Sequence, residues 1–257
     1  NSISIEGSTD IAFREDVGKR FEAYGWQVLK VEDGNDIEAI GKAIEEAKAE
    51  TRKPSLIIVT TEIGYGCPAK QGKASAHGEP LGEENLACTK KQLGWEYDEP
   101  FFVPEEVRAH METIIAKGQK AEEEWNALWE SYAKEYPELA KEWEVWFDKK
   151  LPVDLLNDES FWKFEGKNAT RSSSGEVINR LAKVIPNLIG GSADLAPSNK
   201  STIKGTGDFS AEDRTGANLH FGVREHAMAA IANGMYLHGG LRVFVATFFV
   251  FSDYMKH

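Results

Sequence analysis

The chain has 257 residues, and its 42 Asp and Glu against 30 Lys and Arg give a formal net charge of −12 at pH 7. Its 27 aromatic residues (13 Phe, 7 Trp and 7 Tyr) exclude global disorder, and the acidic balance argues against a nucleic-acid-binding protein. No apolar run is long enough to cross a membrane, no signal peptide is recognisable at the N-terminus, and two cysteines indicate a reducing compartment. We therefore expect a cytoplasmic protein that binds neither nucleic acid nor membranes.

The first part of the chain has the pattern of a βαβ unit. A helix is predicted over 11–24, a strand over 26–31, a helix that begins after Asp36, and a strand over 55–61. The second strand is almost continuously apolar, which is typical of strands buried in parallel sheets. Ligands bind at the carboxyl edge of such sheets, so the loop that follows this strand is a candidate functional loop.

The middle of the chain is more polar. Residues 67–100, rich in Gly and Lys, are predicted to form an extended loop of the kind found at active sites. Pro104 opens a long charged helical region whose apolar stripe indicates packing and needs no ligand; Pro137 interrupts it. Residues 151–167 have scattered aromatic residues without a period and are predicted to be an interdomain linker.

From residue 169 the α/β pattern returns. The predicted elements alternate between helices, strands and polar loops in the order helix 174–184, strand 187–189, turn 190–194, loop 201–217, helix 226–237 and strand 243–248. The sequence therefore predicts an α/β fold with two α/β units, each with a polar loop at a strand end.

Taken one at a time, the motifs do not name a reaction. Glu225 is expected at a helix N-terminus, where a carboxylate is held by backbone N–H groups but is also simply a common helix-start charge. The spacing of His220, Glu225 and His226 lacks the HExxH pattern of a zinc site. His77 lies in a polar loop, where solvent exposure is an equally good explanation. The Gly-x-Gly and Gly-Gly turns match neither a dinucleotide-binding nor a P-loop pattern.

Taken together, the motifs resemble the transketolase family. They occur in the family's order and spacing along essentially the whole chain, as IGYG (63–66), HGEPL (77–81), ATR (169–171), GGSADL (190–195) and FGVREHAM (221–228). Each is weak alone, but the ordered set is highly specific. The resemblance implies that the chain is the middle of a transketolase.

The resemblance also implies the domain organisation. Residues 1–135 are expected to be the C-terminal part of a diphosphate-binding domain, 136–168 a helical and irregular linker, and 169–257 the N-terminal part of a pyrimidine-binding domain. Both would be incomplete α/β domains with mostly parallel sheets flanked by helices. In the full-length family members the active site lies at the interface of a homodimer, so we expect these 257 residues to be inactive alone.

In the first domain the resemblance implies cofactor and metal ligands. The Asn1 side-chain oxygen and the Ile3 carbonyl correspond to ligands of a divalent cation, Mg²⁺ or else Ca²⁺ or Mn²⁺, which prefers oxygen donors. Ile63 corresponds to the apolar residue that packs on thiamine diphosphate. His77 corresponds to a catalytic loop histidine that reaches the diphosphate and the substrate channel.

In the second domain the resemblance implies the rest of the site. Glu225 would hydrogen-bond N1′ of the cofactor's aminopyrimidine and so promote its reactive imino form. Three aromatic residues would surround that ring, although their spacing also suits plain core packing; they are Phe248, Phe251 and Tyr254. Arg171 and Ser198 would bind the phosphate of the sugar substrate. Asp194 would lie near the cofactor and the subunit interface.

The implied activity is the transfer of a two-carbon ketol unit from a ketose phosphate to an aldose phosphate, in the pentose phosphate pathway. Another enzyme of the same cofactor class, a dihydroxyacetone or deoxyxylulose phosphate synthase, stays open as an alternative. A truncated, non-catalytic subunit that pairs with a partner chain is the second alternative.

Overall fold

The computed structural model describes residues 1–148, 150–151, 153–155 and 157–257. The chain divides into two compact units, Asn1–Ala109 and His110–His257, and each is described by itself. Within the described part of the chain, no helix has both the length and the apolar character that a membrane span requires.

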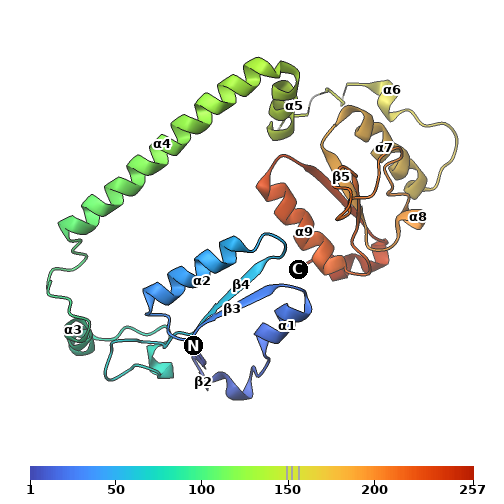
Figure 1. Ribbon diagram of the computed structural model, residues 1–257. Helices are drawn as coiled ribbons and strands as arrows, with labels where there is room; N and C mark the ends of the chain where they lie inside the picture. The colour runs from blue at the N-terminus through green and yellow to red at the C-terminus, as the bar shows by residue number, and fades with distance from the viewer. Residues whose placement is uncertain (149, 152, 156) are drawn as a thin grey trace. The chain divides into compact units, whose positions relative to one another are not determined.

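The first unit is built on a parallel βαβ arrangement (Figure 1). Strand β3 (Gln27–Val31) pairs in parallel with β4 (Ser55–Val59), and α2 (Ile37–Ala49) forms the crossover and packs against both strands. Helix α1 (Val17–Ala23) packs on β3. The predicted strand–helix–strand order is confirmed.

Aspartate caps decide where the two helices begin. The Asp36 side chain accepts a hydrogen bond from the Ala39 N–H at 2.9 Å, and α2 begins directly after it, as predicted. The Asp16 side chain accepts one from the Lys19 N–H at 3.1 Å, so α1 begins at Val17. The prediction of a helix from residue 11 was wrong, because only a 3₁₀ turn precedes this cap, at Thr9–Ile11.

Residues 67–100 contain a helix that the sequence analysis missed. Helix α3 (Glu83–Gln92) has two acidic residues in its first turn and two lysines in its last, which matches the helix dipole. This order of acidic and then basic residues is the feature of the sequence that could have predicted the helix. A short 3₁₀ helix, Ala74–Ala76, precedes it. The unit also contains a small antiparallel hairpin of β1 (Ile3–Ser4) and β2 (Gly7–Ser8).

The long charged region forms α4 (Glu105–Glu135), and Pro137 starts α5 (Pro137–Phe147) as its first residue. The interruption at Pro137 is therefore confirmed. The predicted apolar stripe is present but largely exposed in this chain, since Met111 is 53% and Leu128 63% exposed. In the predicted linker, four residues form α6 (Glu159–Trp162).

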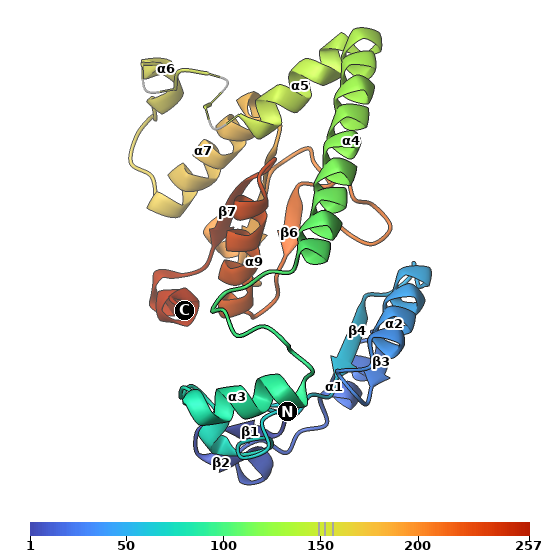
Figure 2. The ribbon, with the colours of Figure 1, turned by 90° about the vertical axis from the view of Figure 1, so that its left-hand side faces the viewer.

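The second unit contains a parallel three-stranded sheet in the order β6-β5-β7. Figure 2 labels its two outer strands, β6 and β7. Its elements in chain order are α7 (Thr170–Val184), β5 (Leu188–Ser192), α8 (Ala196–Asn199), β6 (Asn218–His220), α9 (Glu225–His238) and β7 (Arg242–Ala246). The α/β fold with parallel sheets flanked by helices is confirmed. Strand β6 was not predicted.

Two glycines predicted to form a turn belong instead to the central strand. A Cβ at Gly190 would lie 2.2 Å from the Phe244 carbonyl oxygen, and one at Gly191 would lie 1.8 Å from that of Leu219. Only glycine fits between β5 and its two neighbours at these positions. The chain turns after them, at Asp194, which adopts a left-handed conformation (φ 60°).

Candidate functional site

Glu225 is the first residue of α9 and follows β6 after a tight connection. In that connection Gly222 has a φ of 65°, and Arg224 Nη1 donates a hydrogen bond to the Phe221 carbonyl at 3.0 Å. The Glu225 side chain is held at a helix N-terminus, where the backbone dipoles stabilise a negative charge. Although charged, the residue is only 9% exposed.

One carboxylate oxygen of Glu225 has a protein partner. The Thr247 hydroxyl donates to Oε1 at 3.3 Å, while Oε2 has no hydrogen bond to any described residue. Thr247 directly follows β7, so the pair joins the N-terminus of α9 to the carboxyl end of a strand of the sheet. The sequence analysis missed Thr247, and its place just after a predicted strand was the only signal for it.

The start of α9 is anchored by the core of the second unit. Met228 is fully buried and lies one helical turn after Glu225, and it clusters with Phe221 and Ala193. Leu219 packs against this cluster, as do Val245 and Met255. Because Glu225 shares a turn with the most buried side chain in the helix, its position is fixed by packing.

The three predicted aromatic residues form a ladder. The ring centroids of Phe248 and Phe251 are 6.2 Å apart with planes 20° apart, and those of Phe251 and Tyr254 are 6.2 Å apart at 31°. They follow one side of a 3₁₀ helix, Phe249–Met255, whose three residues per turn align every third side chain. Tyr254 is 63% exposed and the other two rings are half-buried, so the ladder keeps accessible ring surface.

A cavity of about 430 Å³ lies at the carboxyl ends of β5 and β6. Asp194 lines it, together with Ser192, Ser201, His220 and Arg224. The Ser192 hydroxyl accepts a hydrogen bond from the Leu195 N–H at 3.0 Å, which shapes the turn that carries Asp194. Asp194 is exposed.

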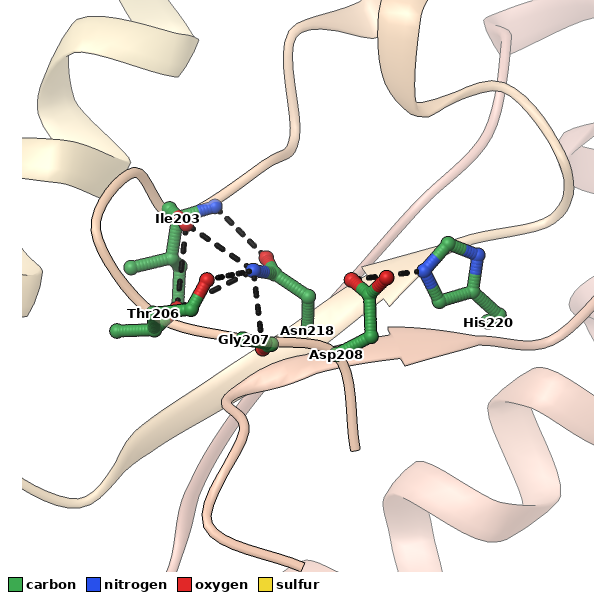
Figure 3. A network of polar contacts seen from close by, with 6 residues as sticks. All are labelled: Ile203, Thr206, Gly207, Asp208, Asn218 and His220. Carbon is green, nitrogen blue, oxygen red and sulfur yellow. Dashed lines mark hydrogen bonds and ion pairs between the residues drawn. The ribbon is translucent and has the colours of Figure 1, made fainter. Parts of the chain in front are cut away.

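The long loop between α8 and β6 bonds to the sheet at Asn218 and His220, both in β6 (Figure 3). The Asn218 carboxamide accepts from the Ile203 N–H at 2.8 Å and donates to the Ile203 carbonyl at 3.0 Å and to Thr206 Oγ1 at 3.2 Å. Beside it, His220 Nε2 lies 3.0 Å from the carboxylate of Asp208. A segment predicted only as a polar loop is therefore a defined wall of the cavity.

Arg171 and Ser198 lie on two helices that pack together, at the start of α7 and in the short α8. Both side chains are exposed. A Cβ at Gly175 would lie 2.5 Å from the Lys200 carbonyl oxygen, so glycine allows α7 and the end of α8 to approach closely. Arg171 and Ser198, the two residues predicted to bind phosphate, are both described in the structure and make no hydrogen bond to each other. The helices that carry them are adjacent.

In the first unit, the candidate residues follow the end of β4. The Asn1 amino group donates to Thr61 Oγ1 at 3.3 Å, which places the start of the chain at this sheet edge. The turn from Ile63 follows, with Ile63 half-buried, and His77 lies exposed in the next loop. In the same loop, a hydrogen bond with the Thr89 hydroxyl lowers the pKa of the buried Cys67 thiol.

Two residues of the first unit, Asn1 and Ile3, are expected to bind the metal ion. The Asn1 side-chain oxygen accepts a hydrogen bond from the Ile3 N–H at 3.2 Å and keeps a second lone pair free, while the Ile3 carbonyl supplies another oxygen. This donor pair fits a hard cation such as Mg²⁺ in type. Over the residues that the structure describes, no group of three or more His, Cys, Asp or Glu side chains could hold a metal ion.

Comparison with known families decides the assignment. The family model of the transketolase thiamine diphosphate binding domain matches residues 1–152, and that of the transketolase pyrimidine binding domain matches 166–257. The chain belongs to the transketolase family.

Relatives within the family are close. The chain is 51% identical to the transketolase of Bacillus subtilis over 257 residues, which is 100% of this chain and 38% of that protein. It is 47% identical over 259 residues to the chloroplastic transketolase of Craterostigma plantagineum, covering 100% of this chain and 50% of that protein. The chain thus spans half or less of the length of these curated transketolases.

Solved structures of transketolases support the same family assignment. A transketolase from Pichia stipitis in complex with sedoheptulose-7-phosphate has a TM-score of 0.89 and 41% identity, covering 99% of this chain and 39% of that one. The transketolase from Leishmania mexicana has a TM-score of 0.89 and 37% identity, covering 100% and 38%. The transketolase assignment and the fold class are confirmed.

The two family matches also divide the candidate residues. Those expected to hold the diphosphate and its metal fall within the first match, namely Asn1, Ile3, Ile63 and His77. Those expected to hold the pyrimidine and the sugar phosphate fall within the second, namely Arg171, Asp194, Ser198, Glu225, Phe248, Phe251 and Tyr254. Each match therefore carries its own set of candidates.

Proposed function

We propose that this chain is the central part of a transketolase that transfers a two-carbon ketol unit from a ketose phosphate to an aldose phosphate, with thiamine diphosphate as cofactor. The observation that supports this most is Glu225, which is 9% exposed, accepts a hydrogen bond from Thr247 on one carboxylate oxygen, and has no hydrogen bond from any described residue on the other. It lies in the region that matches the transketolase pyrimidine binding domain.

Thiamine diphosphate, when bound, supplies the nucleophilic carbon and the electron sink for cleavage of the sugar. The residues of this chain would position the cofactor and take part in one proton transfer. Oε2 of Glu225 would share a proton with N1′ of the aminopyrimidine, while the Thr247 hydroxyl holds Oε1. The accessible faces of the Phe248, Phe251 and Tyr254 ladder would stack on the same ring.

The substrate would be held by a second group of residues. Arg171 and Ser198 would bind the sugar phosphate, because a guanidinium fork and a hydroxyl suit a phosphate dianion. His77 would reach the substrate channel from the first unit, and Asp194 would lie near the cofactor. The Pichia stipitis relative was solved with a sugar phosphate of this class, sedoheptulose-7-phosphate.

The remaining parts of the proposal concern the metal and the assembly. Asn1 and Ile3 would contribute two oxygen ligands to Mg²⁺, or to Ca²⁺ or Mn²⁺, and Ile63 would pack on the cofactor. We also propose the domain limits 1–135, 136–168 and 169–257, a cytoplasmic homodimer with its active site at the subunit interface, and a place in the pentose phosphate pathway.

The experiment that tests this function is a donor–acceptor assay on the full-length enzyme loaded with thiamine diphosphate and Mg²⁺. We expect turnover of sedoheptulose-7-phosphate only when an aldose phosphate acceptor is present. Turnover that requires a different acceptor would favour another enzyme of the cofactor class. No turnover with any acceptor, in a protein that binds the cofactor, would refute the activity.

A further inference from the structure

The loop that carries His77 is folded around one lysine side chain. Lys70 Nζ donates hydrogen bonds to the Ser75 carbonyl and to the Pro80 carbonyl, both at 3.3 Å. The carboxylate of Glu79 lies 4.0 Å from the same nitrogen. Ser75 and Pro80 flank His77 on opposite sides in the sequence, so a single ammonium group bridges the two arms of the loop.

Lys70 is also joined to the turn that carries Ile63. A Cβ at Gly64, whose φ is 65°, would lie 3.2 Å from the Lys70 carbonyl oxygen and 3.0 Å from the Ala76 Cβ. The Gly72 N–H donates to the Ile63 carbonyl at 2.8 Å. The backbone around Lys70 is therefore packed on the Ile63 turn, while its side chain holds the His77 loop.

The polar environment of the Lys70 ammonium argues against a role as a phosphate ligand. A lysine in a Gly-rich loop often binds phosphate, but the side chain of Lys70 is only 18% exposed and its donors are directed at two carbonyls and a carboxylate. The nearby Lys73 has an exposed position. Its Nζ donates to the Ala69 carbonyl, and this bond does not span His77.

His77 itself depends on this loop for its position. Its backbone N–H donates to the Ala74 carbonyl at 2.9 Å, but its ring has no hydrogen bond to any described residue. Because no described residue hydrogen-bonds to the imidazole, its position depends on the backbone on either side. A charged donor that bridges two backbone carbonyls is well suited to this task.

We infer that Lys70 is a positioning residue that fixes the His77 loop on the Ile63 turn, and so holds the imidazole at the cofactor and substrate. This inference rests on the role of His77 in the proposed function. Lys70 contacts neither ligand in this assignment and acts only through the loop.

The first test is independent of activity. Elastase cleaves after small residues such as Ala74 and Ala76, which lie between Lys70 and His77 in the sequence. We expect Lys70→Met to raise the rate of nicking at these two sites about tenfold, because the loop opens more often without its bridging donor. Lys90→Met is the matched control, since Lys90 Nζ donates to a backbone carbonyl elsewhere in the same unit, that of Tyr97 at 2.9 Å. It should leave the nicking rate at these sites unchanged.

Circular dichroism and thermal unfolding establish that each variant is folded. If Lys70→Met does not fold, Lys70→Gln is measured in its place; its neutral side chain keeps a donor, so nicking should rise less but still measurably. A nicking rate at Ala74 and Ala76 equal to that of the wild-type protein, in a folded variant, overturns the inference.

The second test is a double-mutant cycle for ketol transfer in the full-length enzyme. We expect Lys70→Met to lower kcat/KM about tenfold in the wild-type background, and less than about twofold when His77→Ala is already present. Equal losses in both backgrounds would show that Lys70 does not act through His77, and would overturn the inference. If the wild-type enzyme shows no ketol transfer, the proposed function fails and with it the role of the loop in catalysis, whereas the nicking rates still decide whether Lys70 holds the loop.

Discussion

The two α/β units hold their candidate residues in different ways. In the second unit, Glu225 shares a helical turn with the fully buried Met228, and packing fixes it. In the first unit, His77 and Asn1 are exposed. Backbone hydrogen bonds and the Lys70 ammonium hold the loop that carries His77, and a hydrogen bond to Thr61 holds Asn1. The same layout, a loop after a parallel strand, thus supports one site by core packing and the other by polar contacts.

This difference predicts which changes are tolerated. A residue fixed by packing can lose its chemistry without moving, because the core around it is unaffected. A residue fixed by a loop is sensitive to changes in the loop itself. Substitutions that change the chemistry of a side chain should therefore lower activity most in the second unit. Substitutions that change how a loop is held should lower it most in the first.

Glu225→Gln should have the largest effect. The amide keeps the shape of the side chain but cannot give or share a proton as a carboxyl group does, so we expect the full-length enzyme to lose about 10²–10⁴-fold in kcat. The thermal unfolding temperature should stay close to that of the wild-type protein. Glu212→Gln, at an exposed loop position, is the control and should keep full turnover. Wild-type turnover in the Glu225 variant would contradict the assignment.

Gly191→Ala tests the packing of the second unit directly. The new Cβ would lie 1.8 Å from the Leu219 carbonyl oxygen, so β5 and β6 must separate. We expect a loss of about 3 kcal/mol in the free energy of unfolding, measured by urea denaturation.

Gly118→Ala is its matched control. Gly118 lies inside α4, and a Cβ there would meet nothing within 4 Å. Alanine should stabilise this helix by about 0.5–1 kcal/mol. Equal effects of the two substitutions would show that the strands of the second unit are not as tightly packed as the structure indicates.

Arg171→Ala should raise KM for phosphorylated sugars by about 10- to 150-fold, because a charge-assisted contact to phosphate is lost. Donors without a phosphate, such as hydroxypyruvate, should keep their KM. Arg214→Ala removes an exposed arginine from the loop before β6 and should change neither value. The same loss with both types of donor would remove Arg171 from the phosphate site.

The smallest effect concerns the Asp16 cap of the first unit. The hydrogen bond from the Lys19 N–H holds the pKa of this carboxyl below its ordinary value of 3.8. Its contribution to stability is therefore complete above about pH 4 and is lost as the pH falls through the lower, folded-state pKa. The stability difference between the wild-type protein and Asp16→Asn should be constant above pH 5 and shrink below pH 4, measured by chemical denaturation across this range. A difference independent of pH would contradict the cap.

Much of the architecture was predictable because local signals agree with the final fold. The apolar run before Thr60 and the cap at Asp36 correctly predicted β4 and the start of α2. Strand β6 was missed, since three residues after a polar loop carry no period. Its pairing with β5 comes from the sheet, which the local sequence does not encode.

The candidate site divides in the same way. The types and order of residues such as Glu225 and His77 were recognisable, because each motif is a contiguous stretch of sequence. Thr247 and Lys70 were not recognised as partners, since their bonds reach a helix start 22 residues away and a loop carbonyl 10 residues away. Contacts of this kind depend on where the chain returns in space.

The α/β class could be predicted from the sequence because it depends on local periodicity, and the family could be recognised because its motifs are contiguous and ordered along the chain. How each chemical group is held depends on contacts that form only in the folded chain. Gly190 and Gly191 turned out to be packing positions inside β5 because Phe244 and Leu219 approach from both sides. The burial of Glu225 likewise depends on Met228 meeting Phe221 and Ala193, residues that become neighbours only when the sheet and α9 pack together.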